Sequence, residues 1–272
     1  MLRSRIIGCG AYLPEKVVTN DELTKTVDTS NDWIVGRTGI TQRHIAADDQ
    51  LTSDLAHAAA ERAIAAAGIS VNELDLLVLA TSTPDNTFPA TAAKVQARLG
   101  MHQGVAFDVQ AVCAGFICAL SVADKFLLSG QAKKALIIGA ETYSRILDWN
   151  DRTTCVLFGD GAGAAVLSAE NSTENGEERG ILAVKMHSDG RHYDALYVDG
   201  GVSSSQTAGH LRMQGKEVYR QAVVNLAAVA GEALDAAGLA PGDIDWLVPH
   251  QANLRIMNAI AQRLDLPREK MV

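Results

Sequence analysis

One cysteine stands where an extended apolar segment gives way to a helical pattern. The stretch DVQAVCAGFICAL, residues 108 to 120, places Cys113 directly before the small residues Ala114 and Gly115. A strand-to-helix corner exposes a side chain as a nucleophile elbow does, and the N–H groups at a helix start favour a thiolate. The N–H of Cys113 could itself face a developing oxyanion. The pattern predicts a nucleophilic thiol; the alternative is a small buried hydrophobe, the common state of a free cysteine.

A nucleophilic cysteine usually needs a partner that stabilises charge or moves protons. His57 lies in a predicted helix, and five further histidines lie in polar or loop segments: His44, His102, His187, His192 and His210. His250 instead follows the apolar stretch IDWLVP and begins the segment HQANLRIMNAIAQRL. It therefore stands at the same kind of corner as Cys113. We select His250 as the partner of Cys113, with a structural role as the alternative.

Alternating helices and strands must position these two residues. Helical patterns cover 52–68, 89–100 and 114–130, and apolar strand patterns cover 74–82, 104–112 and 134–141. Thr52 or Ser53 is the expected cap of the first helix. The strands lack a clear apolar–polar alternation, which predicts a sheet covered by helices on both faces. The polar segment 168–180 is predicted to be a surface loop between two halves.

Two segments of the chain are similar to one another. The first repeat segment, 63–80, and the second, 233–250, are identical at seven of eighteen positions when aligned without gaps. Chance likeness between alanine-rich helices is the alternative, but the match continues through a loop into a strand. We therefore predict an internal duplication, with halves 1–170 and 171–272. The alignment puts His250 at the end of the second strand, where α/β sheets place ligands.

Composition narrows the class of protein. The chain has 272 residues, 47% of them hydrophobic, and a net charge of −8, which argues against broad nucleic-acid binding. Its longest apolar runs are too short for a membrane-spanning helix. The four cysteines have neither a CxxC pair nor metal-ligand spacing. These features predict a reduced cytoplasmic enzyme without disulfides or a metal site.

Four motifs, in this order, resemble β-ketoacyl-acyl-carrier-protein synthase III: TSNDWIVGRTGI (29–40), DVQAVCAGF (108–116), LFGDGAGAAVL (157–167) and PHQANLRI (249–256). The resemblance runs along the whole chain. It implies a thiolase-like α/β fold with mixed sheets and helices in layers (αβαβα), and a homodimer. It also implies an acyltransferase that condenses an acyl-CoA primer, expected to be acetyl-CoA, with malonyl-acyl-carrier protein to start type II fatty-acid synthesis. No cofactor is expected, because the CoA thioester is a substrate.

The resemblance also implies residue roles. Cys113 would accept the acyl group, and His250 would stabilise the enolate formed when the malonyl group loses CO2. Phe88, in the 81–90 loop, would reach across the dimer towards the acyl pocket of the partner. The positions that match the CoA channel of the family are Trp33, Arg37, Arg152 and Asn253. Core packing is the alternative for Trp33, and an ordinary surface pair is the alternative for Arg37 and Arg152.

Charge adds an expectation about the carrier protein. The chain is acidic, as acyl carrier proteins are, so productive docking needs a local basic patch. Arg255 and Arg263 lie on the predicted helix after His250, and Arg220 lies on the helix before it. Arg255 matches the docking surface of the family best. Ordinary solvated charges are the alternative.

The family pattern is not complete in this sequence. The catalytic asparagine of the family would lie beyond Val272, so we expect the chain to be part of a longer protein. Two other functions stay open. One is a related thiolase-fold polyketide or alkylquinolone-type synthase, and the other is a catalytically inactive partner subunit.

Overall fold

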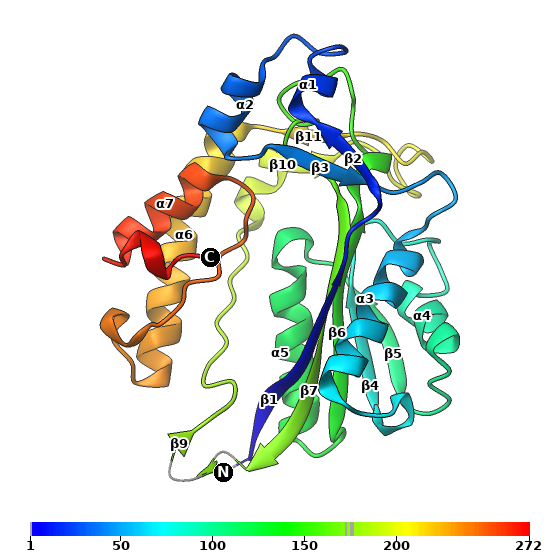
Figure 1. Ribbon diagram of the computed structural model, residues 1–272, viewed down its shortest axis with the longest axis vertical. Coiled ribbons are helices and arrows are strands. Elements are labelled where there is room, and N and C mark those ends of the chain that lie inside the picture. Colours follow the sequence, from blue (N-terminus) through cyan, green and yellow to red (C-terminus); the bar gives the residue numbers. More distant parts are fainter. Residues whose placement is uncertain (1, 172, 175–176) are drawn as a thin grey trace. The chain divides into compact units, whose positions relative to one another are not determined.

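The computed structural model describes residues 2–171, 173–174 and 177–272 (Figure 1). The chain divides into two compact units. The first unit contains Met1–Lys16, His44–Thr142 and Asp160–Val184, and the second contains Val17–Arg43, Tyr143–Gly159 and Lys185–Val272. Each compact unit combines three separate segments of the chain, whereas the predicted halves 1–170 and 171–272 are continuous in sequence. The predicted duplication into these halves stays a prediction.

A mixed five-stranded sheet forms the centre of the first unit, in the order β1-β7-β6-β4-β5 (Figure 1). The long strand β7 (Asp160–Asn171) lies antiparallel to both β1 (Leu2–Tyr12) and β6 (Lys134–Thr142). Strand β4 (Leu76–Ala80) lies parallel to β6 on one side and to β5 (Val105–Val109) on the other. The carboxyl ends of β4, β5 and β6 therefore meet at one edge of the sheet.

Helices cover both faces of this sheet. Helices α3 (Thr52–Ala67) and α4 (Thr91–Leu99) lie on one face, and α5 (Gly115–Leu128) lies on the other (Figure 1). Every residue of β4 is buried; Leu77 belongs to the core on the α3 side, and Val78 to the core on the α5 side. Burial on both faces explains why the strand sequences lack alternation, and it confirms the predicted α/β class.

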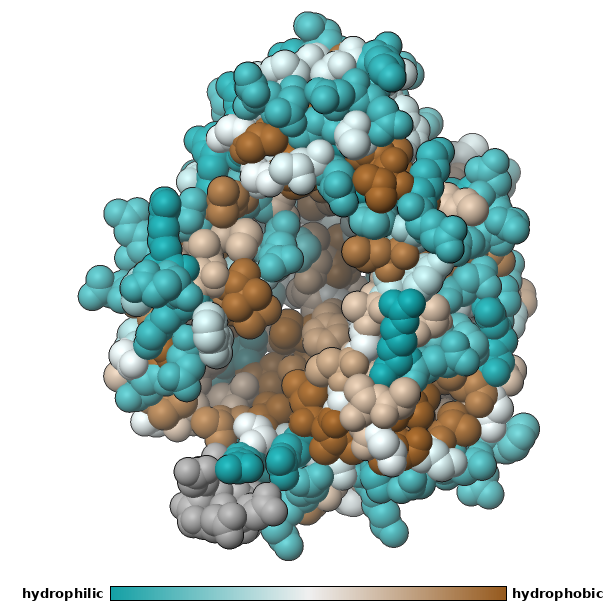
Figure 2. Space-filling view, in the orientation of Figure 1, coloured by the Kyte–Doolittle hydropathy of each residue, from teal (hydrophilic) through white to brown (hydrophobic). Residues whose placement is uncertain are grey.

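Helix α5 is apolar beyond the face that packs on the sheet. Ile117 and Leu128 are 42% and 40% exposed, and Figure 2 shows apolar side chains along this part of the first unit. A surface helix normally has a polar outer face, but on α5 these two apolar residues are exposed beside Lys125. Among the described helices, none is both long and apolar enough to span a membrane.

The start of α3 differs from the sequence prediction. Leu51 is the N-cap, and its N–H donates to Oδ2 of Asp54 at 2.7 Å. Thr52 is the first helical residue, and its hydroxyl donates to the carbonyl oxygen of Thr83 at 2.6 Å. The prediction of Thr52 or Ser53 as the cap was therefore wrong, because a tertiary hydrogen bond takes the Thr52 hydroxyl.

Part of the segment 168–180, which was predicted to be a loop, forms strands. Strand β7 continues through Asn171, paired with β1 as far as Leu2. A short hairpin follows, made by β8 (Thr173–Glu174) and β9 (Glu177–Glu178). The loop prediction was wrong at these strand positions, because the backbone pairing of β7 with β1 and of β8 with β9 overrides a polar sequence. Residues 172, 175 and 176 lie outside the described residues.

The second unit is built mainly from helices. Helix α6 (Gly215–Ala237) packs against α7 (Leu254–Arg263) through a small core that includes Val223, Ile256 and Ile260 (Figure 1). A separate apolar cluster lies beneath α2 (Asn31–Thr38). The remaining short elements near or within this unit are β2 (Lys16–Thr19), α1 (Asn20–Leu23), β3 (Gln42–Ile45), β10 (Leu196–Val198) and β11 (Leu211–Met213).

The two repeat segments have the same local structure. In each, a helix ends at a glycine in the left-handed region, Gly68 with φ 65° and Gly238 with φ 69°. A 3₁₀ turn follows, Val71–Glu73 in the first and Pro241–Asp243 in the second, and the chain then becomes extended. The likeness of the two sequences thus extends to the helix end, the turn and the entry into the strand.

Candidate active site

Cys113 lies in a strained corner of the first unit. After β5 ends, residues Val112–Ala114 form a 3₁₀ turn, and α5 begins at Gly115. Val112 has φ 48°, in the left-handed region. A β-branched residue rarely adopts this conformation, which costs roughly 1–3 kcal/mol and tends to occur at functional sites. The strained residue directly before Cys113 agrees with the predicted elbow, although the helix begins one residue later than expected.

Close packing fixes the corner on the sheet. Gly115 is buried, and a Cβ atom at this position would lie only 3.0 Å from the Cβ of Ala80, the last residue of β4. A larger residue at position 115 would therefore push α5 away from the strand end. The glycine allows the turn that carries Cys113 to sit directly on the carboxyl edge of the sheet.

The electrostatic surroundings of Cys113 oppose ionisation. The thiol is accessible to solvent, yet desolvation by the surrounding protein is the main effect and raises the pKa of Cys113. The negative charge of Glu141 raises this pKa further, while the N–H of Cys113 itself lowers it. The expectation that the helix start favours a thiolate was wrong, because lost hydration and a nearby negative charge outweigh the N–H group.

Glu141 is the residue that the sequence analysis did not single out. It lies near the carboxyl end of β6, in a stretch that was noted only as an apolar strand. The sequence did contain a signal for Glu141, because this carboxylate ends an otherwise apolar strand. The carboxyl ends of such strands are where α/β sheets bind ligands.

Trp33, Arg37 and Arg152 come together in the second unit. The hydroxyl of Ser30 caps α2 by accepting from the Trp33 N–H at 3.1 Å. The Cζ atoms of Arg37 and Arg152 lie 4.4 Å and 5.3 Å from the centroid of the Trp33 ring. Arg152 is also held by the carbonyl oxygen of Asp28 at 2.6 Å. A partly buried aromatic ring with two cations suits a flat ligand that carries negative charge.

Asn253 lies at the start of α7 in the same unit, and His250 lies in the irregular stretch three residues before it. Asn253 is the N-cap, and its Oδ1 accepts from the Arg255 N–H at 2.9 Å. A Cβ at Gly39, the C-cap of α2, would lie 3.0 Å from the Cβ of Leu254, so the end of α2 packs against the start of α7. Desolvation lowers the pKa of His250, which favours the neutral imidazole.

The three arginines predicted to dock a carrier protein have different surroundings. The Cζ atom of Arg255 lies 5.7 Å from the ring centroid of Tyr219 on α6. Arg220 makes two hydrogen bonds to Glu217, at 2.8 Å and 3.2 Å, which raise its pKa and balance its charge. Arg263 is exposed in the last turn of α7. Arg255 and Arg263 thus fit an exposed basic patch better than Arg220 does.

The predicted residues are divided between the two units. Cys113 and Phe88 belong to the first unit, and Phe88 is 81% exposed in the loop after β4. The residues expected to bind CoA or the carrier protein, together with His250, belong to the second unit. The structure thus brings together the tryptophan with its two arginines, and the end of α2 with the start of α7.

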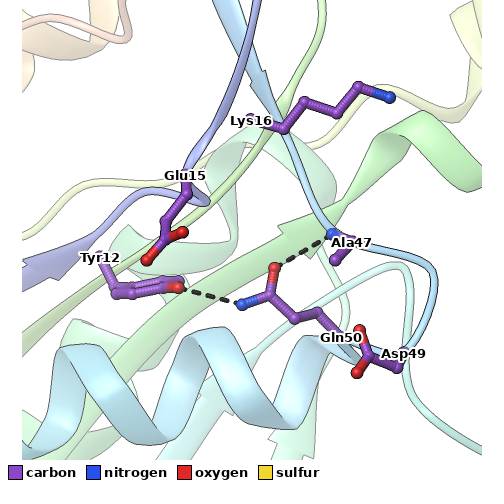
Figure 3. A pocket seen from close by; sticks show the side chains of 6 residues that line it. All are labelled: Tyr12, Glu15, Lys16, Ala47, Asp49 and Gln50. Atoms are coloured by element: carbon purple, nitrogen blue, oxygen red, sulfur yellow. Dashed lines mark hydrogen bonds between the residues drawn. The ribbon is translucent and has the colours of Figure 1, made fainter.

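A surface pocket in the first unit contains none of the predicted site residues. It has a volume of about 590 Å³ and is lined by Tyr12, Glu15, Lys16, Ala47, Asp49 and Gln50 (Figure 3). Gln50 spans it, accepting from the Ala47 N–H and donating to the Tyr12 hydroxyl, both at 3.0 Å. The amide of Gln50 is therefore used within the protein.

Two sequence models of one family match the chain. The model described as 3-oxoacyl-[acyl-carrier-protein] synthase III matches residues 107–190, and the model of its C-terminal part matches residues 234–272. The first match includes the Cys113 corner, and the second includes His250 and Asn253.

Comparisons over the whole of this chain agree with these matches. The chain is 64% identical over 272 residues to the β-ketoacyl-[acyl-carrier-protein] synthase III of Paramagnetospirillum magneticum, covering all of this chain and 84% of that protein. The crystal structure of the corresponding synthase III from Pseudomonas aeruginosa is similar with a TM-score of 0.92 and 44% identity, covering 99% of this chain and 82% of the other.

A priming β-ketosynthase from a polyketide biosynthetic pathway is also similar in structure. Its TM-score is 0.89 at 36% identity, over 99% of this chain and 80% of that one. The higher identity to the fatty-acid enzymes favours them over this alternative, and the shared architecture confirms the thiolase-like fold. The chain therefore belongs to the β-ketoacyl-[acyl-carrier-protein] synthase III family, the condensing acyltransferases that initiate type II fatty-acid synthesis.

Proposed function

We propose that Cys113 is the nucleophile that takes the acyl group from acyl-CoA. The observation that carries this proposal is the accessible thiol directly after the strained residue Val112. In this step a bond forms between Sγ of Cys113 and the thioester carbonyl carbon. The bond from that carbon to the CoA sulfur breaks, and the thiol proton leaves with CoA. Acetyl-CoA is the primer we propose, and the reaction needs no further cofactor.

His250 acts in the second half-reaction. When malonyl-carrier protein loses CO2, negative charge develops on the thioester oxygen of the resulting enolate. A histidine whose pKa is lowered by desolvation is neutral at physiological pH. It therefore donates an N–H hydrogen bond to that oxygen without acting as a strong acid. The enolate carbon then attacks the acyl group, and the Cys113 sulfur leaves and takes up a proton.

Trp33 with its two arginines is the proposed site for the nucleotide part of CoA. An aromatic ring stacks on the adenine, and guanidinium groups bind phosphates. An adenine between Trp33 and Arg152 needs two contact distances of about 3.5 Å each. The present separation is 5.3 Å, so binding must move Arg152 away from the ring. Arg37 would keep its place, and Asn253 would line the channel with its amide.

Arg255 and Arg263 are the proposed contacts for the acidic carrier protein, with Arg220 in a smaller role because Glu217 balances its charge. The acidic chain, with a net charge of −8, repels an acidic partner at long range. Local basic groups along α7 would overcome this repulsion and set the orientation of the complex.

The enzyme is proposed to be a cytoplasmic homodimer. Phe88, which is 81% exposed, is too large and apolar to favour contact with water. Covering it with a second copy of the chain would remove this apolar surface from solvent. The four cysteines are free in the structure, which supports a reducing compartment. Sedimentation of the protein as a monomer at micromolar concentration would contradict the dimer.

Intact mass after incubation with acetyl-CoA tests the nucleophile. We expect a gain of about 42 Da, since one acetyl group replaces one proton in covalent catalysis, and peptide mapping should place it on Cys113. Cys113→Ala should abolish the adduct and condensation while keeping the fold. Cys118→Ala, at the partly buried cysteine one turn further along α5, is the matched control and should keep both. An adduct that persists in Cys113→Ala would overturn the proposal.

A further inference from the structure

A buried arginine of the second unit joins separate segments of the chain. Arg43, on β3, is only 5% exposed. Its Nη1 donates to the carbonyl oxygen of Val18 at 3.1 Å, and its Nη2 donates to Oδ1 of Asn20 at 2.7 Å and to the carbonyl oxygen of Val156 at 3.2 Å. One planar guanidinium thus connects β3 to the end of β2, to the start of α1 and to the segment around Val156.

The electrostatics of Arg43 make these bonds strong. All three acceptors are neutral oxygens, and desolvation lowers the pKa of the guanidinium. A buried cation depends on such acceptors, because each bond replaces one that water would otherwise make. Arg43 therefore holds the Asn20 side chain and the Val156 carbonyl firmly.

Asn20 extends this restraint to both ends of α2. The side chain is 1% exposed, and its Nδ2 donates to Oδ1 of Asn31 at 3.0 Å and to the carbonyl oxygen of Ile40 at 2.8 Å. Asn31 is the first residue of α2, and Ile40 follows its C-cap, Gly39. Since Arg43 binds Oδ1 of Asn20, the amide cannot turn over without losing bonds on both sides.

The restrained segments carry the residues proposed to bind the nucleotide of CoA. Trp33 and Arg37 lie on α2, between the two ends that the asparagine binds. Arg152 lies four residues before Val156, and the two segments share one buried apolar cluster. Arg43 thus acts on α2 through the asparagine and directly on the segment that follows Arg152.

We propose that Arg43 and Asn20 are positioning residues for acyl-CoA binding, which hold α2 in place for the nucleotide. The proposal rests on the proposed role of Trp33, Arg37 and Arg152 in binding that nucleotide. Arg152 moves away from the Trp33 ring when an adenine enters, so the opposite wall of the site must keep its place. A ring that is already fixed loses little freedom on binding. Loosening α2 therefore weakens binding and leaves the chemical steps unchanged.

Asn20→Asp is the main test, because it keeps the size of the side chain and the acceptor for Arg43 but removes both donors to α2. The new carboxylate gives the buried guanidinium a full counter-charge, so the fold should survive. Asn31 can turn its own amide to donate, whereas the Ile40 carbonyl cannot, so the end of α2 is released. The Kd of CoA, measured by calorimetry, and the KM for acetyl-CoA should rise about tenfold, with kcat unchanged within about twofold.

The position of Trp33 can be measured without any ligand. In enzyme labelled with fluorotryptophan, the fluorine NMR signal of Trp33 is assigned as the one that Trp33→Phe removes. Asn20→Asp should shift or broaden this signal and leave that of Trp246 in place. Asn72→Asp is the matched control, since it makes the same chemical change at an exposed residue of the first unit. It should alter neither the Trp33 signal nor the affinity for CoA.

Two further variants test the rest of the network. Arg43→Lys keeps the charge but has one nitrogen in place of the fork, so it cannot serve acceptors on both sides. It should change the Kd of CoA and the Trp33 signal in the same direction as Asn20→Asp. Asn31→Ala removes one of the two bonds to α2 at an exposed residue, so it folds even if the buried variants do not. It should raise the Kd of CoA about threefold.

Trp33→Ala separates failure of this proposal from failure of the proposed nucleotide site. If Trp33→Ala weakens CoA binding while the folded network variants bind CoA as the parent does, Arg43 and Asn20 have a purely structural role and the proposal is overturned. If Trp33→Ala binds CoA with the parent affinity, the nucleotide site itself is wrong, and the proposal falls with it. A fall in kcat as large as the rise in KM would also contradict a role in positioning for binding.

Discussion

The two repeat segments have one local structure and two different environments. In the first, Val78 is fully buried in a strand with a neighbour on each side. Its counterpart in the second, Val248, is 70% exposed, and in the described chain this extended stretch has a single bridge, from Leu247 to Met271. Local sequence therefore determines the helix end, the turn and the extended backbone. Burial depends on what packs against them.

This difference fits a division of labour between the units. The first unit has a core covered on both faces, which provides a rigid edge for the strained corner of Cys113. The second unit leaves aromatic and cationic side chains accessible, including Arg37, Arg152 and Arg255. A rigid support suits a nucleophile, and accessible cations suit recognition of phosphates and an acidic protein.

The largest expected effect separates the two half-reactions. His250→Ala should lower malonyl decarboxylation and condensation by roughly 10²–10³-fold, as the loss of an oxyanion donor does. Acylation of Cys113 should change only a few-fold, because His250 is assigned to the second half-reaction and other residues are proposed to bind acyl-CoA. Radiolabelled acetyl transfer and product formation measure the two steps separately. Equal losses in both would mean that His250 mainly activates Cys113, and the proposed division would fail.

Docking of the carrier protein is expected to depend on the second unit alone. Arg255→Glu should raise the KM for malonyl-carrier protein about tenfold at low salt, because charge complementarity at the docking surface is reversed. The defect should shrink as salt rises, since screening weakens attraction and repulsion alike. Acylation of Cys113 by acetyl-CoA should stay near the parent rate.

Lys133→Glu is the matched control for this change. It makes the same change of charge at an exposed residue of the first unit, just before β6 and thus at the opposite edge of the sheet from Cys113. We expect no change in the KM for malonyl-carrier protein. An equal defect in Lys133→Glu would point to overall charge instead of a docking site at Arg255.

A pair of equivalent substitutions tests the difference in burial. Val78→Ala should lower the free energy of unfolding by about 2 kcal/mol, through lost apolar burial and a cavity. Val248→Ala should change it by less than about 0.5 kcal/mol, as exposed sites do. Urea denaturation followed by far-UV circular dichroism measures both. The three tryptophans, Trp33, Trp149 and Trp246, all lie in the second unit, so their fluorescence reports that unit separately. Similar losses for both variants would contradict the burial difference.

Much of the first unit was predictable, because its strands and helices have strong local patterns. The helices starting at Thr52 and Gly115 and the buried strand around Val78 were all predicted within a few residues. The cap of α3 was not, since the Thr52 hydroxyl binds Thr83, which is distant in sequence. The strand end around Ser168 was missed for a similar reason: its pairing with Arg5 is long-range.

The site was predictable in its residue types but not in its electrostatics. The corner at Cys113 and the grouping of Trp33 with Arg37 follow from local sequence and from family resemblance. The raised pKa of Cys113 does not, because it depends on desolvation and on Glu141, which arrives on another strand. Sequence around the cysteine shows the helix start that would lower this pKa. It does not show the carboxylate that opposes it.

The smallest expected difference is between the stability costs of one substitution made at the helix end of each repeat segment. Gly68 and Gly238 both have left-handed backbones, and a Cβ at either would meet nothing within 4 Å. Alanine at each position should therefore cost about 1 kcal/mol through the backbone conformation alone. Because no packing enters, the two costs should agree within about 0.5 kcal/mol, although burial differs strongly ten residues later in each segment. Gly238→Ala could instead cost nothing while Gly68→Ala costs the full amount. The turn after α6 would then relax on substitution, and packing in the first unit would be what holds the turn at Gly68 in the left-handed conformation.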